Sequence, residues 1–177
     1  SGGWGMPPGG QSAGNMNLYI NGGYTYVNSS GDGIDINGSV VMTGGTLIVD
    51  GPTANNNGAV DYDGSFKISG GTLIAAGSSG MAQAPGSSSS QHSVLVNFSS
   101  SHSADELFHI EDSSGNNILT FTPAKRYSSV AFSSPQLANG KTYKVYYGGS
   151  STGTKTDGVF SGGSYSAGTN STSFTIS

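Results

Sequence analysis

The stretch VVMTGGTLIVD, residues 40–50, decides the fold, because one similar stretch precedes it and another follows it. The earlier copy is LYINGGYTYVN, residues 18–28, and the later copy is FKISGGTLIAA, residues 66–76. Aligned on their Gly-Gly pairs, the copies lie 22 and then 26 residues apart. Apolar strands that recur every ~20–30 residues between glycine corners are typical of a β-solenoid. The repeat therefore predicts an all-β protein whose first half is a parallel β-helix of about three coils.

Apolar residues keep to alternate positions in all three copies, as they do when parallel strands stack in register. The columns predicted to face the interior before the glycine corner are Leu18, Val40 and Phe66, and then Ile20, Met42 and Ile68. The column between them ends at Lys67, and a lysine there indicates that this column faces outward. The interior columns predicted after the corner are Leu47 and Leu73, and then Val27, Val49 and Ala75. Tyr26, Ile48 and Ile74 align on the opposite face, which we expect the C-terminal part of the chain to cover.

The rest of the chain divides around this repeat. Residues 1–15, SGGWGMPPGGQSAGN, form a Gly/Pro-rich arm, and we assign the coils to residues 16–85. Residues 86–91, GSSSSQ, are a low-complexity stretch that we interpret as a linker. Residues 92–177 contain short alternating strands separated by SSG, ANG and GGS turns. This pattern predicts a C-terminal module of β-hairpins that packs on one end of the coils and covers their open edge.

The composition restricts the class of protein and its partners. Of the 177 residues, 33% are apolar and 9% are charged, and the 30 glycines suit many short strands and tight turns. The 6 basic residues are scattered, whereas a nucleic-acid partner requires a basic stripe. No stretch approaches the ~20 apolar residues of a membrane span. A chain rich in Ser, Thr, Asn and Gly, with so few basic residues, indicates a secreted, extracellular or cell-surface protein.

A second repeat places acidic residues on adjacent coils. GIDINGS, residues 33–39, matches AVDYDGS, residues 59–65, so that Ile34 aligns with Val60. With these apolar residues facing inward, alternation points the intervening side chains outward. The outward side chains that carry oxygen atoms on this face are Asp35, Asn37, Asp61 and Asp63.

The spacing of these side chains suits a metal ion. Asp35 and Asp61 are expected about 5 Å apart, because neighbouring strands lie ~4.8 Å apart. Two like charges at that distance repel by ~1 kcal/mol in water, and a hard cation reverses the sign. Oxygen ligands suit Ca²⁺, so we predict a calcium site, with Asp32 and Asp50 as further candidate ligands. The alternative is an acidic ladder whose charges are screened by water.

Tyrosines offer a candidate sugar-binding surface. Tyr19, Tyr24 and Tyr26 crowd the first copy of the repeat, and Tyr146 lies in the strand YKVYY. Flat aromatic rings stack on the C–H faces of sugars, while Asn, Ser and Asp side chains suit sugar hydroxyls. We take these four tyrosines and the outward-facing Lys67 as candidate carbohydrate-binding residues. The alternative is that the tyrosines pack on neighbouring strands, where Tyr is common.

Catalytic interpretations find less support in the sequence. A glycoside hydrolase needs a carboxyl with a raised pKa in a cleft, whereas Glu106, Glu111 and Asp112 lie in polar, turn-like contexts that predict solvation. His102 is assigned to a loop and His109 to a strand. The sequence contains no nucleophile elbow, zinc-protease motif or phosphate-binding loop. We therefore expect a binding protein rather than an enzyme.

The run from residue 31 to residue 85 closely resembles the polysaccharide-binding β-helix family of cellulolytic clostridia. Residues 109–149 and 157–168 resemble the C-terminal part of the same family. The resemblance implies a right-handed parallel β-helix, an extracellular location, bound calcium, and binding to cellulose and to acidic, pectin-like polygalacturonate. The family's GDGID and DYDG motifs fall on Asp32, Asp35, Asp61 and Asp63.

Three functions are weighed on these grounds. The leading hypothesis is a calcium-dependent module that binds plant cell-wall polysaccharide. The second is a self-assembling extracellular protein, a homo-oligomer or filament joined through its coil ends, with Trp4 and Met6 of the arm as anchors. The third is a polysaccharide lyase, since the family resembles pectate lyases in fold. Those enzymes use an arginine base, whereas the single arginine of this chain, Arg126, lies in the C-terminal module, so lyase activity is not expected.

Overall fold

The computed structural model describes residues 16–177, whose regular secondary structure consists of β-strands only. The all-β class predicted from the repeat is confirmed. The arm of residues 1–15, with the predicted assembly residues Trp4 and Met6, lies outside the described residues. Residues 16–177 contain no helix that could span a membrane.

The strands of the repeat region are β1 (Met16–Asn28), β2 (Ile34–Ile36), β3 (Gly38–Asp50), β4 (Val60–Tyr62), β5 (Phe66–Ile68) and β6 (Thr72–Gly77). The strands that follow are β7 (Ser93–His102), β8 (Phe108–Asp112), β9 (Asn117–Phe121), β10 (Tyr127–Ser133), β11 (Thr142–Tyr147), β12 (Ser150–Ser151), β13 (Thr154–Thr156), β14 (Val159–Ser161), β15 (Tyr165–Ser166) and β16 (Thr169–Thr175).

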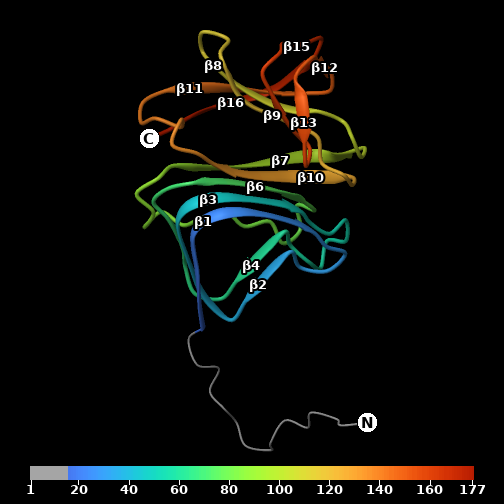
Figure 1. The fold of residues 1–177 in the computed structure, drawn as a ribbon. Coiled ribbons are helices and arrows are strands. Elements are labelled where there is room, and N and C mark those ends of the chain that lie inside the picture. Colours follow the sequence, from blue (N-terminus) through green and yellow to red (C-terminus); the bar gives the residue numbers. More distant parts are fainter. Residues whose placement is uncertain (1–15) are drawn as a thin grey trace, which may run out of the picture.

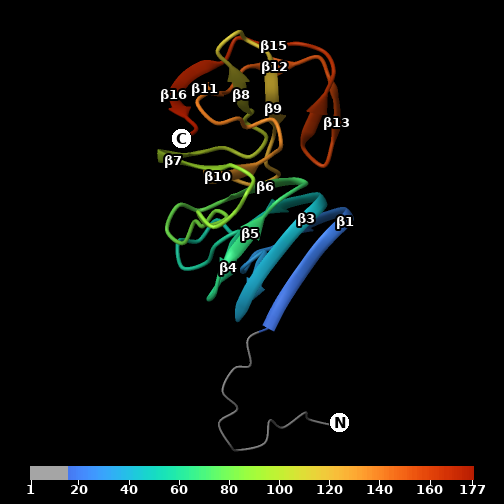
Figure 2. The ribbon, with the colours of Figure 1, turned by 90° about the vertical axis from the view of Figure 1, so that its left-hand side faces the viewer.

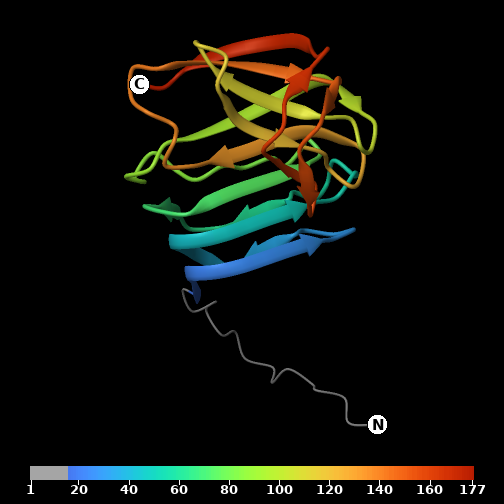
Figure 3. The ribbon, with the colours of Figure 1, turned by 45° about the horizontal axis from the view of Figure 1, so that its top comes forward.

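The strands of the repeat region pair in parallel and in register. β1 pairs with β3, and β3 pairs with both β5 and β6. Leu18 lies beside Val40 and Val40 beside Phe66, while Val49 lies beside Ala75 after the glycine corner. This is the register predicted from the Gly-Gly repeat. The short strands β2 and β4 form a separate parallel pair, and Figure 3 shows β1, β3 and β6 lying one above another.

Side chains that alternate inward from these strands form one buried core. Val40, Met42, Phe66, Ile68 and Leu73 each have an exposed fraction of 0% and belong to one apolar cluster. Their counterparts on β1 are only partly buried, because β1 is the outer strand of its sheet. The apolar columns of the sequence are therefore the interior of the coils.

The Gly-Gly pairs mark corners at which successive copies of the repeat touch backbone to backbone. The second glycine of each pair has a positive φ, which is 78° at Gly23, 84° at Gly45 and 88° at Gly71. A Cβ atom on Gly45 would lie 2.6 Å from the carbonyl carbon of Gly22 in the coil before it. A Cβ atom on Gly71 would lie 2.7 Å from the carbonyl oxygen of Gly45. Glycine is required here for its dihedral angle and for the space it leaves.

The chain after β6 continues along the coils. The amide of Gly86 donates a hydrogen bond to the carbonyl of Phe66 at 2.8 Å, and the amide of Gln91 donates to the carbonyl of Ile68 at 3.0 Å. Residues 86–91, which the composition suggested as a linker, thus lie along β5 and are held by backbone hydrogen bonds.

Parallel pairing ends where β10 joins β6 in antiparallel orientation. β7 pairs with β10, so the order of strands is β1-β3-β6-β10-β7, and this sheet is named the coil sheet. A second sheet has the order β13-β14-β9-β8-β11-β16 and is named the cap sheet. It lies above β7 and β10 of the coil sheet in Figures 1 and 2. The C-terminal module is therefore continuous with the coils through the backbone hydrogen bonds between β6 and β10.

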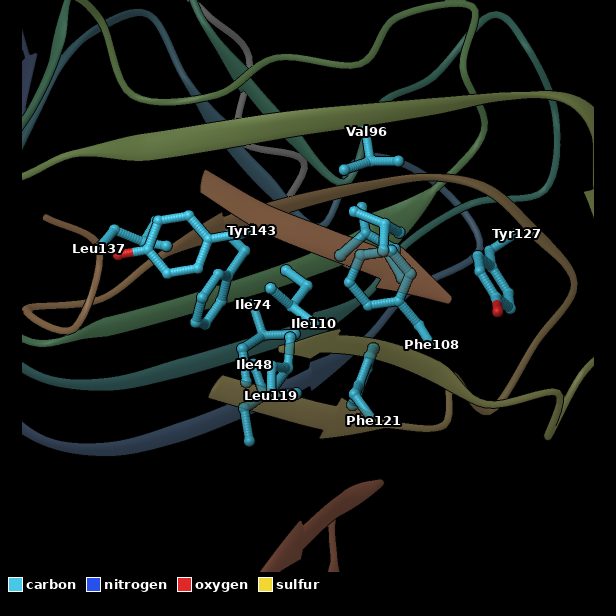
Figure 4. Close-up of a cluster of buried hydrophobic side chains, with 14 of the residues drawn as sticks. Ile48, Ile74, Val96, Phe108, Ile110, Leu119, Phe121, Tyr127, Leu137 and Tyr143 are labelled. Atoms are coloured by element: carbon cyan, nitrogen blue, oxygen red, sulfur yellow. The ribbon is translucent and has the colours of Figure 1, made fainter. Parts of the chain in front are cut away.

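A second core fills the space between the coil sheet and the cap sheet (Figure 4). Ile48 and Ile74 enter it from the coil sheet, and Phe108 and Phe121 enter it from the cap sheet. Ile48 is 1% exposed and Ile74 is 2% exposed, which confirms that the C-terminal module covers this face of the coils. Tyr26 packs at the margin of the same core.

Alanine substitution at the glycine corners should separate the cost of the dihedral angle from the cost of the backbone contact. Gly45→Ala strains φ and forces Cβ against Gly22, so we expect it to lower the free energy of unfolding by ~2–5 kcal/mol. Gly23→Ala is the matched control, because Gly23 has a similar φ but no neighbour within 4 Å of its Cβ position. We expect a loss of ~1–2 kcal/mol there. Chemical denaturation measures both losses, and equal values would contradict the backbone contact.

Candidate functional site

Three aspartates meet on the outer side of the β2–β4 pair. Asp35 of β2 lies directly opposite Asp61 of β4 in the parallel register. Asp32 lies in the turn that precedes β2. One carboxylate oxygen from each residue lies within 4.8 Å of the others. The structure thus brings together three of the residues that the sequence indicated as metal ligands, and we name this group the acidic face.

Packed coils hold the acidic face in position. Oδ1 of Asp32 accepts a hydrogen bond from the amide of Gly58 at 2.8 Å, which ties the turn before β2 to the next coil. The hydroxyl of Ser29 donates to the carbonyl of Asp32 at 3.0 Å. Ile34 and Val60 belong to the coil core, so the residues that alternate with them point outward. The carboxylates are therefore positioned by the coil spacing and by a hydrogen-bonded turn.

The acidity of Asp61 is altered by its position among these carboxylates. The pKa of Asp61 is raised, first by partial burial of its carboxyl group and then by the charges of Asp32, Asp35 and Asp63. A hydrogen bond with the Asp32 carboxyl also raises this pKa, and such a bond requires a proton between the two groups. Within residues 16–177 the only ion pairs are those of two histidines, so no lysine or arginine neutralises these aspartates. The negative charge of the acidic face can therefore be neutralised by a bound proton or by a bound cation.

The donor atoms of the acidic face fit a hard divalent cation. Ca²⁺ takes about six to eight oxygen ligands, and aspartate carboxylates are among its usual ligands. Asp32, Asp35 and Asp61 would hold such an ion and would leave further coordination positions for water or for oxygens of a ligand. A soft transition metal prefers sulfur or imidazole ligands, and this group contains neither.

The remaining predicted ligands lie outside this group. Asp63 and Asn37 are exposed and directly follow β4 and β2, one residue beyond the strand ends. Asp50 does not belong to the acidic face, which corrects the sequence prediction. It is 2% exposed and accepts hydrogen bonds from the Tyr26 hydroxyl and from the amide of Ala124, the latter at 3.0 Å. Asp50 therefore joins the coil sheet to the loop before β10.

The candidate carbohydrate-binding residues do not form one surface. Tyr19 and Tyr24 are 61% and 54% exposed on β1, and Lys67 is exposed on β5 in the same register column as Tyr19. Tyr26 is a packing residue, because its ring lies against the core between the sheets. Tyr146 lies on β11 in the cap sheet, half-buried among other aromatic rings. The structure therefore separates these residues into distinct places.

A buried polar cluster in the cap sheet was not predicted. His109 is 2% exposed, with Nδ1 at 2.8 Å from Thr120 Oγ1 and Nε2 at 3.0 Å from Glu111 Oε2. The Tyr165 ring stacks on the imidazole at 3.9 Å between centroids. Burial lowers the pKa of His109, and the neighbouring Glu111 opposes that effect. Alternation in LFHIED places His109 on the face away from the core, but nothing in the sequence indicates that Tyr165 covers that face.

Because the pKa of Asp61 is raised, the stability of the folded protein should depend on pH. A carboxyl whose pKa is raised on folding binds its proton more tightly in the folded state, so stability falls as pH rises above the ordinary value of 3.8. We expect Asp61→Asn to remove this loss and to raise the Tm of the metal-free protein at neutral pH. Asp105→Asn is the control, because Asp105 is an exposed aspartate outside the acidic face. Thermal melts in chelator measure the effect, and an unchanged or lower Tm for Asp61→Asn would contradict it.

Comparison of the chain with protein-family models, with curated proteins and with solved structures gives no match in any of the three. The function must therefore be argued from the residues of this chain and from the geometry described above.

Proposed function

We propose that this chain is a secreted, non-catalytic module that binds acidic, pectin-like polysaccharides through calcium held on the acidic face. The observation that carries the proposal is the group of three carboxylates within 4.8 Å of one another on adjacent coils. The raised pKa of Asp61 supports it: burial of the carboxyl group is the main cause of the shift, and repulsion from Asp32, Asp35 and Asp63, which a bound cation relieves, adds to it. The resemblance of the sequence to clostridial polysaccharide-binding proteins favours the same class of ligand, with cellulose as its neutral member.

The proposal includes a finer assignment of the fold. We assign the parallel, in-register pairs of the repeat region to a right-handed parallel β-helix, which the in-register columns and the resemblance support. Outward columns of such a helix form straight ladders with steps of ~4.8 Å. A regular ladder of side chains is a suitable surface for a regular polymer.

Calcium resolves a conflict of charge between protein and ligand. The chain has a formal net charge of −4, and polygalacturonate is a polyanion, so direct contact with the acidic face is repulsive. Bound calcium would supply positive charge and open positions for uronic carboxylates. Asp35 is exposed, so this face of the coils is accessible to a polymer.

The absence of an adjacent base supports binding without chemistry. A lyase needs a base that removes a proton from the sugar carbon. Arg126, the single arginine, lines a surface cleft together with Thr53 and Asn55, and within residues 16–177 it forms no ion pair with the acidic face. The acidic face therefore has ligands for a cation and no neighbouring guanidinium.

The proposal predicts that calcium stabilises the protein and links it to its ligand. Calcium should raise the Tm, because a ligand at 100 times its Kd adds ~2.7 kcal/mol to the free energy of unfolding. Polygalacturonate should retain the protein in calcium and release it in chelator. The variant Asp35→Asn with Asp61→Asn should lose both effects, while Asp105→Asn keeps both. Thermal melts and affinity electrophoresis in polygalacturonate gels measure them.

Two outcomes would contradict this function. A melting curve that is the same in calcium and in chelator would exclude the calcium site. Ultraviolet absorbance from unsaturated oligosaccharides, released from polygalacturonate by the pure protein, would exclude the non-catalytic assignment.

A second candidate function, self-assembly, is favoured by the outer strand of the coil sheet. Met16, Tyr19 and Tyr24 are among the few large apolar residues that are exposed in residues 16–177, and all three lie on β1. β1 contains no charged residue, whereas edge strands are commonly protected by charge. A second copy of the chain could add a strand here and bury the partly exposed rim of the coil core.

Self-assembly through β1 predicts a mass that rises with protein concentration in light scattering. The double variant Tyr19→Lys with Tyr24→Lys should weaken association, because it places two charges on the strand that would pair. Thr156→Lys is the control, since Thr156 is exposed on β13 in the cap sheet. A monomeric mass at every concentration would exclude this second function.

A further inference from the structure

A cleft of about 440 Å³ lies at the seam between the two sheets, and its volume is within the range of small-molecule sites. β7 lies at the edge of the coil sheet opposite to β1, and β16 lies at one edge of the cap sheet; both contribute side chains to the cleft. The residues that line it are Asn97, Phe98, Ser99, Ser100, His102, Tyr147, Asn170, Ser171 and Thr172. We name it the seam cleft.

Aromatic rings form one part of the seam cleft. The ring of His102 lies 4.4 Å from that of Phe98 and 4.5 Å from that of Tyr147, measured between centroids. The rings of Phe98 and Tyr147 lie 6.3 Å apart in an edge-to-face arrangement. Phe98 also packs against the core between the sheets, so the aromatic group is held in place by the interior. Such rings offer a fixed apolar surface to a ligand.

Some polar side chains of the seam cleft have no hydrogen-bond partner within residues 16–177. Asn97, Asn170 and the Tyr147 hydroxyl form no hydrogen bond there, while Nδ1 of His102 is held by Glu106 at 3.2 Å and its Nε2 stays free. Ser93 carries the only buried side-chain polar atom without a partner in this part of the chain, so the free groups of the cleft face solvent. His109 differs, because both of its nitrogens are engaged.

The chemistry of these groups selects the ligand. No acidic residue, lysine or arginine lines the seam cleft. Aromatic rings accept the C–H faces of a sugar, while amides and hydroxyls donate to and accept from its hydroxyl groups. We propose that the seam cleft binds a neutral sugar unit without calcium. The inference rests on the proposed saccharide-binding function for its ligand class, but its site shares no residue with the acidic face.

A neighbouring cleft indicates a chain of sugars rather than a single one. It has a volume of about 270 Å³ and shares Phe98, Ser99 and Ser100 with the seam cleft. It continues past Ser101 and Ser128 to Asn55 and to Arg126, whose guanidinium group can donate hydrogen bonds to sugar hydroxyls. The two clefts together therefore provide adjacent sites for successive units of one neutral polysaccharide.

Titration with cellohexaose in the presence of chelator tests the proposal, with calorimetry for affinity and NMR for location. Cellohexaose should bind, and the shifted amides should lie among the residues that line the two clefts, with those of β7 and β16 in the seam cleft among them. Asn170→Ala removes one amide from an exposed position and should weaken binding about 3- to 10-fold. Tyr147→Ala should weaken it about 10-fold or more, and Tyr147→Phe should lose only the contribution of the hydroxyl. Asn56→Ala is the matched control, an exposed asparagine outside both clefts.

The outcomes separate this inference from the calcium-dependent function. Asp61→Asn should leave cellohexaose binding unchanged, and Asn170→Ala should leave calcium-dependent retention on polygalacturonate unchanged. If the unmodified protein binds cellohexaose but not polygalacturonate, the proposed calcium-dependent function is excluded and the seam cleft is supported. Three results would overturn the seam cleft as a sugar site: no binding of cellohexaose or xylohexaose, shifted amides only in residues that line neither cleft, or full affinity in Asn170→Ala and Tyr147→Ala. Unchanged melting of each variant shows that the fold is retained.

Discussion

The backbone contact between glycines of successive coils sets a spacing on which much else depends. Gly45 lies against Gly22, and Gly71 lies against Gly45, with no room for a side chain between them. The register between β1 and β3 is irregular at Asn21, within this corner, and is the same before and after it, with Ile20 beside Met42 and Tyr24 beside Thr46. The same spacing places Asp35 opposite Asp61 on the short strands of the coil. The geometry of the acidic face is therefore a consequence of how closely two backbones can approach.

The strands β3 and β6 separate the two hydrophobic cores and contribute side chains to both. Leu47 and Val49 face the interior of the coils, whereas Ile48 faces the core between the sheets. Because adjacent residues of one strand hold both cores, loss of packing on one side weakens the other. Asp50 accepts hydrogen bonds from the Tyr26 hydroxyl and from the amide of Ala124, and these bonds add a polar link between the two sides. Coils and cap therefore form one structural unit.

Features with a sequence period could be predicted, and features that depend on single long-range contacts could not. The register of Leu18, Val40 and Phe66 follows from the spacing of glycines, as does the pairing of Asp35 with Asp61. The burial of Asp50 depends on Tyr26 and on a loop far along the chain, which no repeat indicates.

The low-complexity stretch and the seam cleft illustrate the same limit. Residues 86–91 are predicted to be a linker from their composition. Backbone amides can form hydrogen bonds with a strand whatever the side chains are, and the amides of Gly86 and Gln91 bond to carbonyls of β5. The seam cleft is lined by residues of β7 and β16, which lie far apart in the sequence. These residues are of types that are common throughout the chain, such as Asn, Ser and aromatic residues, so no motif marks them. Only the closure of the two sheets brings them together.

Because β10 pairs with β6 in antiparallel orientation, further parallel copies of the repeat could extend the coil sheet only at the edge formed by β1. A tandem copy of the repeat, 22 or 26 residues long, fits the coil sheet beside β1, where parallel pairing continues, but not beside β10. Each such copy would add one more rung of aspartates and would leave the far end, with its seam cleft, unchanged. Gene duplication within this repeat would therefore add carboxylates to the proposed calcium-binding face without altering the residues of the proposed neutral-sugar site.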